Sequence, residues 1–360
     1  MSMIKSKSSP SEQHELSEDL LKQMYEAMVL ARVLDERCFK LQRQGRIGFY
    51  AGSAGEEACQ VGTALAMEAS DWAFTSYRQP AVALALGSTL QTLFNNLFGN
   101  REDIAKGRQM PIHYSDRAHH FLSVSSVIGT QIIQGVGFAM AAKIKKDPAV
   151  ALTYFGDGAT SSNDFHSGMN FAATYKAPIV LVLVNNQFAI STPVTRQTGV
   201  SELSDKAKAY GMPGVHVDGN DVIAVYQATK EAIERARSGA GPTLLELKTY
   251  RRGPHSSSDD PSRYRNQGEI EEWPDPISIF ESRIQSCSFF SDAYKAQVYD
   301  LANAQLAEAI QYAESVPAPD WESIIDDVYE EAPQSLKRQA EDIFAYEKNL
   351  ELTNEGEFPL

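Results

Sequence analysis

Short apolar segments alternate with helix-like segments in the second half of the chain, and this alternation most constrains its fold. Residues 150–155, 179–184 and 243–249 are each predicted to be a buried strand, because β-branched and apolar side chains dominate them. Residues 165–175 and 222–237 carry a helical pattern. Strands that alternate with helices form a parallel sheet covered on both faces. The sequence therefore predicts an α/β fold with a doubly wound parallel sheet.

Helical segments flank this α/β region. Apolar side chains recur at steps of four and three from Leu20 to Leu41, which predicts a long amphipathic helix that ends near Gly45. Similar spacing indicates a later helix over residues 298–310, and an acidic, partly helical tail follows from about residue 320. We therefore expect helical extensions at the N-terminal and C-terminal ends of the α/β domain.

The organisation of the chain is predicted to be simple. Residues 1–16 are rich in Ser, Lys, Glu and Gln and have no apolar period, so we expect a flexible arm there. Residues 17–360 contain no repeat and no obvious linker between two large domains. We expect one α/β domain with a helical C-terminal extension from about residue 270.

The charge balance and the apolar runs argue against two classes of protein. The formal net charge of −14 over 360 residues disfavours binding to nucleic acid phosphates. The longest apolar run covers residues 179–184, whereas a membrane span needs roughly 20 apolar residues. The chain opens with neither a signal core nor an Arg-rich transit pattern, and its 3 cysteines form no C-x-x-C pair. We expect a cytoplasmic protein that binds neither nucleic acid nor a membrane.

An acid flanked by glycines follows the first predicted strand. Residues 150–155 lead directly into Gly156-Asp157-Gly158, and a helix is expected next. Ligands of α/β proteins bind at the carboxyl ends of parallel strands. Glycines let a ligand approach the backbone closely, and a helix N-terminus favours a phosphate group. Taken alone, the triplet fits a plain strand-to-helix turn equally well.

Two asparagines strengthen the ligand-binding interpretation. Asn185 and Asn186 directly follow the second predicted strand. Between them and the Gly156-Asp157-Gly158 triplet lie 26 residues, 159–184, which is enough for one helix and one strand. The tips of the two strands can therefore bring Asp157 and Asn186 together. A carboxylate and an amide oxygen are hard ligands that leave positions open for water and diphosphate oxygens, as Mg²⁺ prefers. We predict a diphosphate held through a magnesium ion.

This G-D-G triplet, followed at this distance by Asn-Asn, resembles the signature of thiamine diphosphate enzymes. Over most of the chain the sequence is similar to the alpha subunit of the dehydrogenase component of 2-oxo acid dehydrogenase complexes, and within that group to the branched-chain type. The resemblance implies the thiamine diphosphate-binding fold, with this chain as the diphosphate-binding domain. It also implies thiamine diphosphate and Mg²⁺ as cofactors, with Asp157, Asn186 and the carbonyl of Phe188 as magnesium ligands.

The same resemblance implies further cofactor contacts. The backbone of Gly158 and Ala159 matches diphosphate contacts of the family. Tyr77 and Arg78 match an aromatic-arginine pair that clamps the phosphate, a task that suits a guanidinium because it donates two hydrogen bonds at once. Without the resemblance, Arg78 would be predicted to lie on the surface.

Residues 125–131 match a loop that lies against the rings of the cofactor. Ser126 corresponds to a polar contact, and Ile128 to the apolar residue that wedges the cofactor into a bent shape. Some relatives also bind K⁺ through this loop, and Val127 replaces a proline there and offers only its carbonyl. The groups equivalent to the potassium ligands belong to Ser125, Val127, Thr130 and Gln131.

Residues 250–260 match the active-site loop of the family, and their polar, glycine- and proline-bearing composition independently predicts an exposed loop. His255 matches a catalytic histidine that reaches the cofactor and assists the reaction with the lipoyl group. On residue type alone, a single loop histidine is more often a solvated bystander. Arg251, Asp259 and Tyr264 match residues that order this loop.

Two segments favour a branched-chain substrate over pyruvate, namely residues 107–113, which end at His113, and residues 258–260. The resemblance then implies 3-methyl-2-oxobutanoate dehydrogenase (2-methylpropanoyl-transferring), an oxidoreductase of branched-chain amino acid catabolism. It decarboxylates the 2-oxo acid oxidatively and acylates a lipoyl group. Two positions depart from animal relatives, because Pro254 replaces a second histidine and Val184 replaces an arginine on the cofactor phosphate.

The resemblance also implies protein partners. Single-chain thiamine enzymes carry two cofactor-binding domains and are longer, whereas this chain carries only the diphosphate-binding one. The glutamate that activates the cofactor is then supplied by a pyrimidine-binding beta subunit in an α₂β₂ heterotetramer. The lipoyl group belongs to an acyltransferase component. We expect an isolated alpha chain to have essentially no turnover.

Two alternative functions stay open at this point. The first keeps the same site but acts on pyruvate or acetoin. The second is a noncatalytic, nucleotide-binding assembly subunit with a doubly wound fold. No G-x-G-x-x-G turn and no G-x-x-x-x-G-K-[ST] loop follows a strand in this sequence, which disfavours the second alternative.

Overall fold

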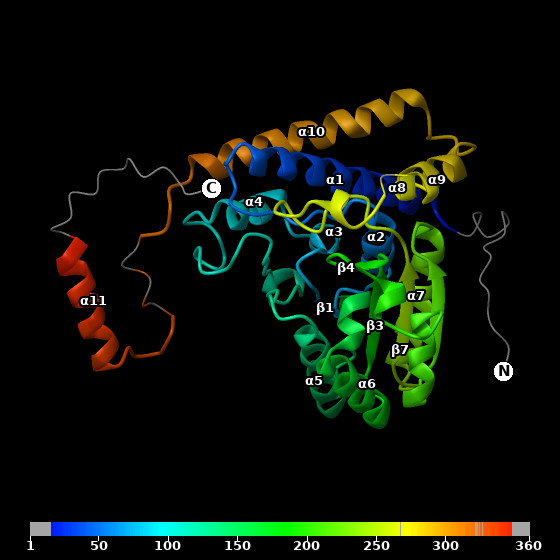
Figure 1. The fold of residues 1–360 in the computed structure, drawn as a ribbon, viewed down its shortest axis with the longest axis horizontal. Coiled ribbons are helices and arrows are strands. Elements are labelled where there is room, and N and C mark those ends of the chain that lie inside the picture. Colours follow the sequence, from blue (N-terminus) through cyan, green and yellow to red (C-terminus); the bar gives the residue numbers. More distant parts are fainter. Residues whose placement is uncertain (1–15, 267, 321–322, 324, 326, 348–360) are drawn as a thin grey trace.

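A parallel sheet of five strands lies at the centre of the protein. The computed structural model describes residues 16–266, 268–320, 323, 325 and 327–347. The strands run in the order β1-β2-β3-β7-β6, and all neighbouring pairs are parallel (Figure 1). They are β1 (Trp72–Phe74), β2 (Ala151–Gly156), β3 (Ile179–Asn185), β6 (Gly214–Asp218) and β7 (Thr243–Lys248). This arrangement confirms the predicted α/β fold.

The three central strands are confirmed where the sequence predicts them, whereas the sequence predicts neither edge strand. β2, β3 and β7 are buried along almost their whole length, which is why they are apolar runs. β6 is largely exposed or half-buried, and β1 has only 3 residues. Edge strands are covered on fewer sides, so neither shows a continuous apolar signal.

Helices cover both faces of the sheet. The structure contains α1 (Glu18–Arg43), α2 (Glu57–Leu65), α3 (Pro80–Ala85), α4 (Leu90–Phe98), α5 (Thr130–Lys145), α6 (Asn163–Tyr175), α7 (Val222–Arg237), α8 (Gly268–Glu272), α9 (Pro276–Ile284), α10 (Asp292–Ser315) and α11 (Gln334–Glu347). Alternate residues of β3 point to opposite faces. Leu181 and Leu183 join a core with α5 and α6, whereas Val180 and Val182 join a larger core with α2 and α7.

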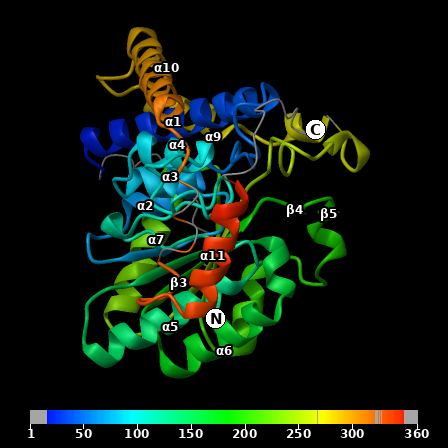
Figure 2. The same cartoon turned by 90° about the vertical axis from the view of Figure 1, so that its left-hand side faces the viewer.

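The predicted long helices form a layer at one end of the molecule. α1 and α10 lie side by side there, away from α5 and α6 (Figures 1 and 2). α1 begins after Ser17, whose Oγ accepts a hydrogen bond from the Leu20 amide at 3.3 Å, and it ends at Arg43 as the sequence predicts. α10 confirms the later predicted helix. The predicted arm falls outside the described residues except at Leu16, and so does part of the acidic tail.

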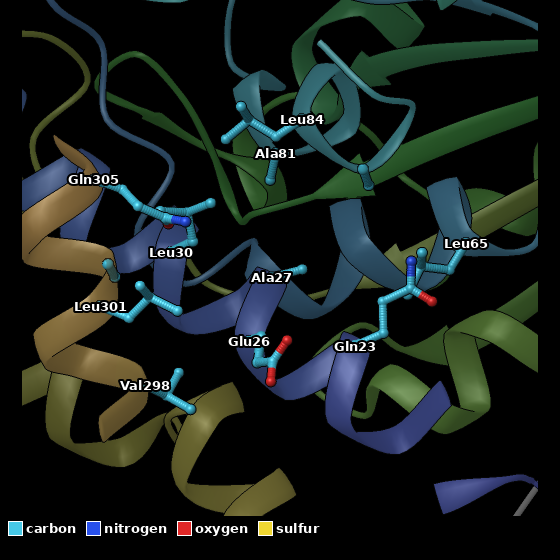
Figure 3. Close-up of a pocket in the computed structure, with 12 residues that line it drawn as sticks. Gln23, Glu26, Ala27, Leu30, Leu65, Ala81, Leu84, Val298, Leu301 and Gln305 are labelled. Atoms are coloured by element: carbon cyan, nitrogen blue, oxygen red, sulfur yellow. The ribbon is translucent and has the colours of Figure 1, made fainter. Parts of the chain in front are cut away.

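A hollow of about 280 Å³ lies between α1, α2, α3 and α10 (Figure 3). Its walls are mostly aliphatic side chains, and the polar side chains of Gln23, Glu26 and Gln305 complete them. None of the site residues predicted from the sequence lines it. In the part of the chain that the structure describes, no helix is both long and apolar enough to cross a membrane.

The α2–α7 contact depends on a glycine. A Cβ at Gly62 would lie 2.8 Å from the Val222 carbonyl oxygen and 2.8 Å from a Val225 methyl group. We expect Gly62→Ala to lower the free energy of unfolding by about 1–3 kcal/mol because backbone must move. Gly137→Ala is the matched control, since a Cβ on that exposed helical glycine would have nothing within 4 Å, and it should raise the free energy by about 0.5–1 kcal/mol. Chemical denaturation measures both, and equal effects would contradict the packing described.

Candidate functional site

The G-D-G triplet forms the end of β2 and a tight turn. β2 ends at Gly156, a 3₁₀ turn covers Asp157–Ser161, and α6 then begins at Asn163. The sequence predicts a helix after the triplet, and the structure inserts this 3₁₀ turn before it. A Cβ on Gly158 would lie 2.6 Å from the Cβ of Ala189. The turn therefore packs against β4 (Phe188–Ala189) so closely that only glycine fits.

Asp157 is a buried carboxylate at this turn. It is 2% exposed, and its Oδ2 accepts a hydrogen bond from Nε2 of Gln197 at 2.7 Å. Burial raises the pKa of Asp157 to about 6, although the hydrogen bond from Gln197 opposes that shift. A bound cation would stabilise the ionised form of such a carboxylate.

Sheet register brings Asn186 to the same edge. Gly156 of β2 is paired with Val184 of β3, so the residues that follow each strand emerge side by side. The Asn186 amide nitrogen donates to Glu56 Oε1 at 2.6 Å, and its Oδ1 accepts from the Phe188 amide at 3.3 Å. β4 and β5 (Thr192–Pro193) then form an antiparallel hairpin. The predicted magnesium ligands thus lie on adjoining segments.

The chemistry of these groups fits Mg²⁺ with a diphosphate. The set comprises one buried carboxylate, one amide oxygen and one backbone carbonyl, which are all hard oxygen ligands. The Phe188 carbonyl accepts a hydrogen bond from Nη1 of Arg251 at 3.2 Å and has a second lone pair. Among the described residues, no group of three or more His, Cys, Asp and Glu side chains could hold a metal ion, so the structure offers no rival cluster of that type.

Arg78 is buried beside His255, contrary to the surface position that residue type alone predicts. It is 5% exposed. Its Nη1 donates to the carbonyl of Gly52, and its Nη2 donates to the carbonyl of His255 at 3.0 Å. The same Nη2 lies 3.2 Å from Nδ1 of His255. The Tyr77 ring meets the His255 ring edge-on, with 6.0 Å between centroids, so these three predicted residues form one cluster.

The loop that carries His255 is more buried than its composition predicts. Arg251 is only 1% exposed and donates hydrogen bonds to the Ile190 carbonyl and the Tyr264 hydroxyl, both at 2.7 Å. Asp259 accepts from the His255 amide at 2.7 Å and from the Tyr264 hydroxyl. The prediction of an exposed loop is therefore wrong for much of this segment, because buried charged and polar groups tie it to the body.

Residues 125–131 lie against the start of α6. Gly129 has a φ of +96°, and a Cβ there would lie 2.5 Å from Ser162 Oγ, which caps α6. Ser126 Oγ lies 3.0 Å from Nε2 of His113. Val127 and Ile128 are 63% and 47% exposed, so the loop presents apolar side chains outward.

Only three of the four predicted potassium-binding residues are joined to one another by hydrogen bonds. The Val127 amide donates to Ser125 Oγ at 3.3 Å, and Thr130 Oγ1 donates to the Val127 carbonyl at 2.9 Å. Gln131 is buried, and its amide nitrogen donates to the carbonyl of Tyr154 at 2.9 Å. Three of the residues therefore share one turn, while the Gln131 side chain is engaged with β2.

Comparison with known proteins decides the family. A family model described as "Dehydrogenase E1 component" matches residues 25–322. The chain belongs to the dehydrogenase E1 component family. This E1 chain is 40% identical over 328 residues to 2-oxoisovalerate dehydrogenase subunit alpha 2, mitochondrial, of Arabidopsis thaliana, a match that covers 90% of this chain and 70% of the relative.

Two further relatives show how broad the similarity is. The mitochondrial 2-oxoisovalerate dehydrogenase subunit alpha of Bos taurus is 40% identical over 337 residues, which cover 93% of this E1 chain and 74% of the relative. The pyruvate dehydrogenase E1 component subunit alpha of Staphylococcus aureus (strain Mu50 / ATCC 700699) is 42% identical over 330 residues, covering 91% and 87%. Membership of the family establishes a 2-oxo acid dehydrogenase E1 alpha subunit and leaves the substrate open between these two types.

The structure of the E1 chain adds buried carboxylates that sequence reasoning missed. Glu56 contacts Asn186, and Asp35 accepts a hydrogen bond from the Ser53 amide at 2.6 Å beside Gly52. Burial raises the pKa of Asp35 to about 6 and that of Glu56 to about 7. Asp35 could have been noticed, because it is a charged residue on the buried stripe of α1. Glu56 and Gln197 give no such signal, since their partners are 130 and 40 residues away.

The surroundings of His255 in this E1 chain predict a neutral imidazole. Burial, followed by the positive charges of Arg78 and Arg251, lowers the pKa of His255 to about 4. We expect no titration of His255 between pH 5 and pH 8 in NMR spectra of protein with ¹³C-labelled histidine. The unfolded chain takes up this proton near pH 6.5, so His255 should make the folded state progressively less stable as the pH falls from about 6.5 to about 4.

Arg78→Gln removes one of the two positive charges and should raise the pKa of His255. The resonance of His255 is identified as the histidine signal that is missing from the spectrum of His255→Asn. A midpoint near 6.5 in the unsubstituted protein, or an unchanged midpoint in Arg78→Gln, would contradict this electrostatic account.

Proposed function

We propose that this E1 chain is the alpha subunit of a branched-chain 2-oxo acid dehydrogenase that depends on thiamine diphosphate. The observation that carries the proposal is the convergence of Asp157, Asn186 and the buried Arg78 at the carboxyl edge of one parallel sheet. This is where α/β proteins bind ligands, and the groups present suit a metal-bound diphosphate. In this proposal, residues 17–360 form one diphosphate-binding domain with a helical extension from about residue 270.

The chain's own residues would hold the cofactor in the following way. Asp157, Asn186 and the Phe188 carbonyl bind Mg²⁺. Tyr77, Arg78 and the backbone of Gly158 and Ala159 bind the diphosphate, while Ser126 and Ile128 contact the rings; Ser125, Val127, Thr130 and Gln131 are the corresponding candidates for K⁺. When bound, thiamine diphosphate supplies the carbanion that attacks the 2-oxo carbon and accepts the electrons left by CO₂.

His255 is proposed as the catalytic residue of this chain. Its Nδ1 faces the Arg78 guanidinium, which can only donate hydrogen bonds, so Nδ1 is the acceptor and the ring proton resides on Nε2. Arg78 thereby sets the tautomer. The Nε2–H group is then the one that can donate a hydrogen bond during transfer of the acyl group to the lipoyl sulfur.

The family implies protein partners that complete the site. A beta subunit contributes the pyrimidine-binding half, and we propose an α₂β₂ heterotetramer with the cofactor between subunits. A lipoyl-bearing acyltransferase receives the acyl group. The exposed Val127 and Ile128 lie on the loop that would reach this shared cofactor.

The substrate preference rests on short segments. His113, beside Ser126, and the run Ser258-Asp259-Asp260 favour a branched-chain 2-oxo acid such as 3-methyl-2-oxobutanoate. Pyruvate is the second candidate, supported by the similarity to the Staphylococcus aureus pyruvate dehydrogenase subunit, and acetoin is the third. The predicted cytoplasmic location stays a prediction, because both mitochondrial and bacterial proteins are among the relatives.

A substrate panel tests the proposal. Dye-coupled decarboxylation is measured with thiamine diphosphate and Mg²⁺, with and without a candidate beta chain. We expect activity only with both chains, and higher kcat/KM for 3-methyl-2-oxobutanoate than for pyruvate or acetoin. A preference for pyruvate would overturn the substrate assignment alone. Turnover by the alpha chain by itself, or absence of cofactor binding by the assembled protein, would overturn the proposed function.

A further inference from the structure

Glu56 is a buried carboxylate that belongs to no sequence motif and has no role in the function proposed so far. It immediately precedes α2 and is 1% exposed, yet its side chain makes no capping hydrogen bond to that helix. Its Oε1 instead accepts a hydrogen bond from Asn186 Nδ2 at 2.6 Å and lies 3.9 Å from Nε of Arg78. Glu56 thus lies between the segment with the metal-binding amide and the segment with the phosphate-binding guanidinium.

The contact with Glu56 determines which way the Asn186 amide faces. The two ends of a primary amide differ, because the nitrogen only donates hydrogen bonds and the oxygen only accepts them. An ionised carboxylate also only accepts, and in the structure the Asn186 amide nitrogen does lie on the side of Glu56 and donates to it at 2.6 Å. The nearby charge of Arg78 favours the ionised form of Glu56 and therefore this orientation. Oδ1 then lies on the opposite side, where it accepts a long hydrogen bond of 3.3 Å from the Phe188 amide and keeps a lone pair for another partner.

The wrong orientation of this amide would prevent metal binding. Rotation by 180° would direct the NH₂ group at the cation, and that group has no lone pair to offer. The two orientations have nearly the same shape, so packing alone discriminates poorly between them. The hydrogen bond to an acceptor-only neighbour supplies the discrimination.

We propose that Glu56 is a positioning residue that keeps the oxygen of Asn186 directed at the magnesium ion, an inference that rests on the function proposed above. Neutralising Arg78 is the competing role for Glu56. The Arg78 guanidinium, however, is held by the carbonyls of Gly52 and His255, and its 3.9 Å separation from Glu56 is too long for a hydrogen bond. The ion pair with Arg78 neutralises charge but does not orient the Asn186 amide, whereas the hydrogen bond to Asn186 does.

A donor-acceptor swap tests this role directly. In Glu56→Gln the side chain can donate as well as accept, so both orientations of the Asn186 amide become possible. In Asn186→Asp two buried carboxylates face each other, and one must bind a proton. In the double variant, the introduced glutamine donates to the introduced aspartate, whose other oxygen can bind the metal. The hydrogen bond is then restored with its direction reversed.

The readout is the affinity of the full chain, assembled with its beta subunit, for Mn²⁺ in the presence of thiamine diphosphate, measured by electron paramagnetic resonance. Loss of a hydrogen bond behind a metal ligand commonly weakens metal affinity about 10–100-fold. We expect a loss of that size in each single variant and recovery of most of the affinity in the double variant. Unchanged affinity in Glu56→Gln, or a double variant no tighter than the weaker single variant, would overturn the proposal.

Glu57→Gln is the matched control. Glu57 is the adjacent buried carboxylate, and it binds Arg32 at 2.6 Å and the Gly55 amide at 2.9 Å. We expect this variant to unfold at lower temperature with unchanged Mn²⁺ affinity, and an equal loss of affinity would assign the effect of Glu56 to general destabilisation. If Asn186→Asp does not fold, Glu56→Gln against Glu57→Gln decides the question. Failure of the unsubstituted protein to bind Mn²⁺ would contradict the proposed function. Mn²⁺ affinity that is the same with and without the Glu56→Gln substitution would contradict only this inference.

Discussion

The hydrogen bonding of two buried guanidinium groups is the constraint on which the carboxyl edge of the sheet depends. Arg78 and Arg251 are only 5% and 1% exposed. A buried charge without partners is strongly destabilising, so each needs acceptors placed around it. Arg78 is bound by the carbonyls of Gly52 and His255, and Arg251 by those of Phe188 and Ile190. These contacts bring loops from distant parts of the chain onto the ends of β2 and β3.

Buried carboxylates lie around the same edge and are held in an unfavourable state. Burial raises the pKa of Asp35 and Asp157 to about 6 and that of Glu56 to about 7. Each of these groups loses solvation in the folded chain, and the protein does not fully compensate that loss. A divalent cation at Asp157 would change this balance, because its charge stabilises the ionised carboxylate. Carboxylates with raised pKa values at the end of a parallel sheet are typical of sites that bind charged ligands.

The sequence predicts the parts of this structure in which a residue's environment follows from its own neighbours. The buried strands β2, β3 and β7 are continuous apolar runs, and α1 and α7 have regular apolar spacing, so these elements are confirmed. The edge strands β1 and β6 lack such a run. The 3₁₀ turn at Asp157 and the burial of the His255 loop depend on packing against β4 and on long-range hydrogen bonds, which local patterns do not contain.

The candidate site divides in the same way. Asp157 and Asn186 could be predicted because each directly follows a strand, and register in a parallel sheet places strand ends together. Arg78 required a resemblance to a family, since nothing local indicates that it is buried. Glu56 could not be predicted, because its role is defined by a partner 130 residues away. The positions of the candidate site residues therefore depend on tertiary contacts, whereas the sheet that carries them follows from local sequence patterns.

In the proposed site, the turn after β2 and the turn after β3 bind one metal-diphosphate unit. The most direct measurement is a crystal structure of the chain assembled with its beta subunit, thiamine diphosphate and Mn²⁺, with anomalous scattering used to locate the ion. We expect one ion within about 2–2.3 Å of oxygens of Asp157, Asn186 and Phe188 and of the diphosphate. A diphosphate bound elsewhere, or an ion at this edge without the Asn186 oxygen, would contradict it.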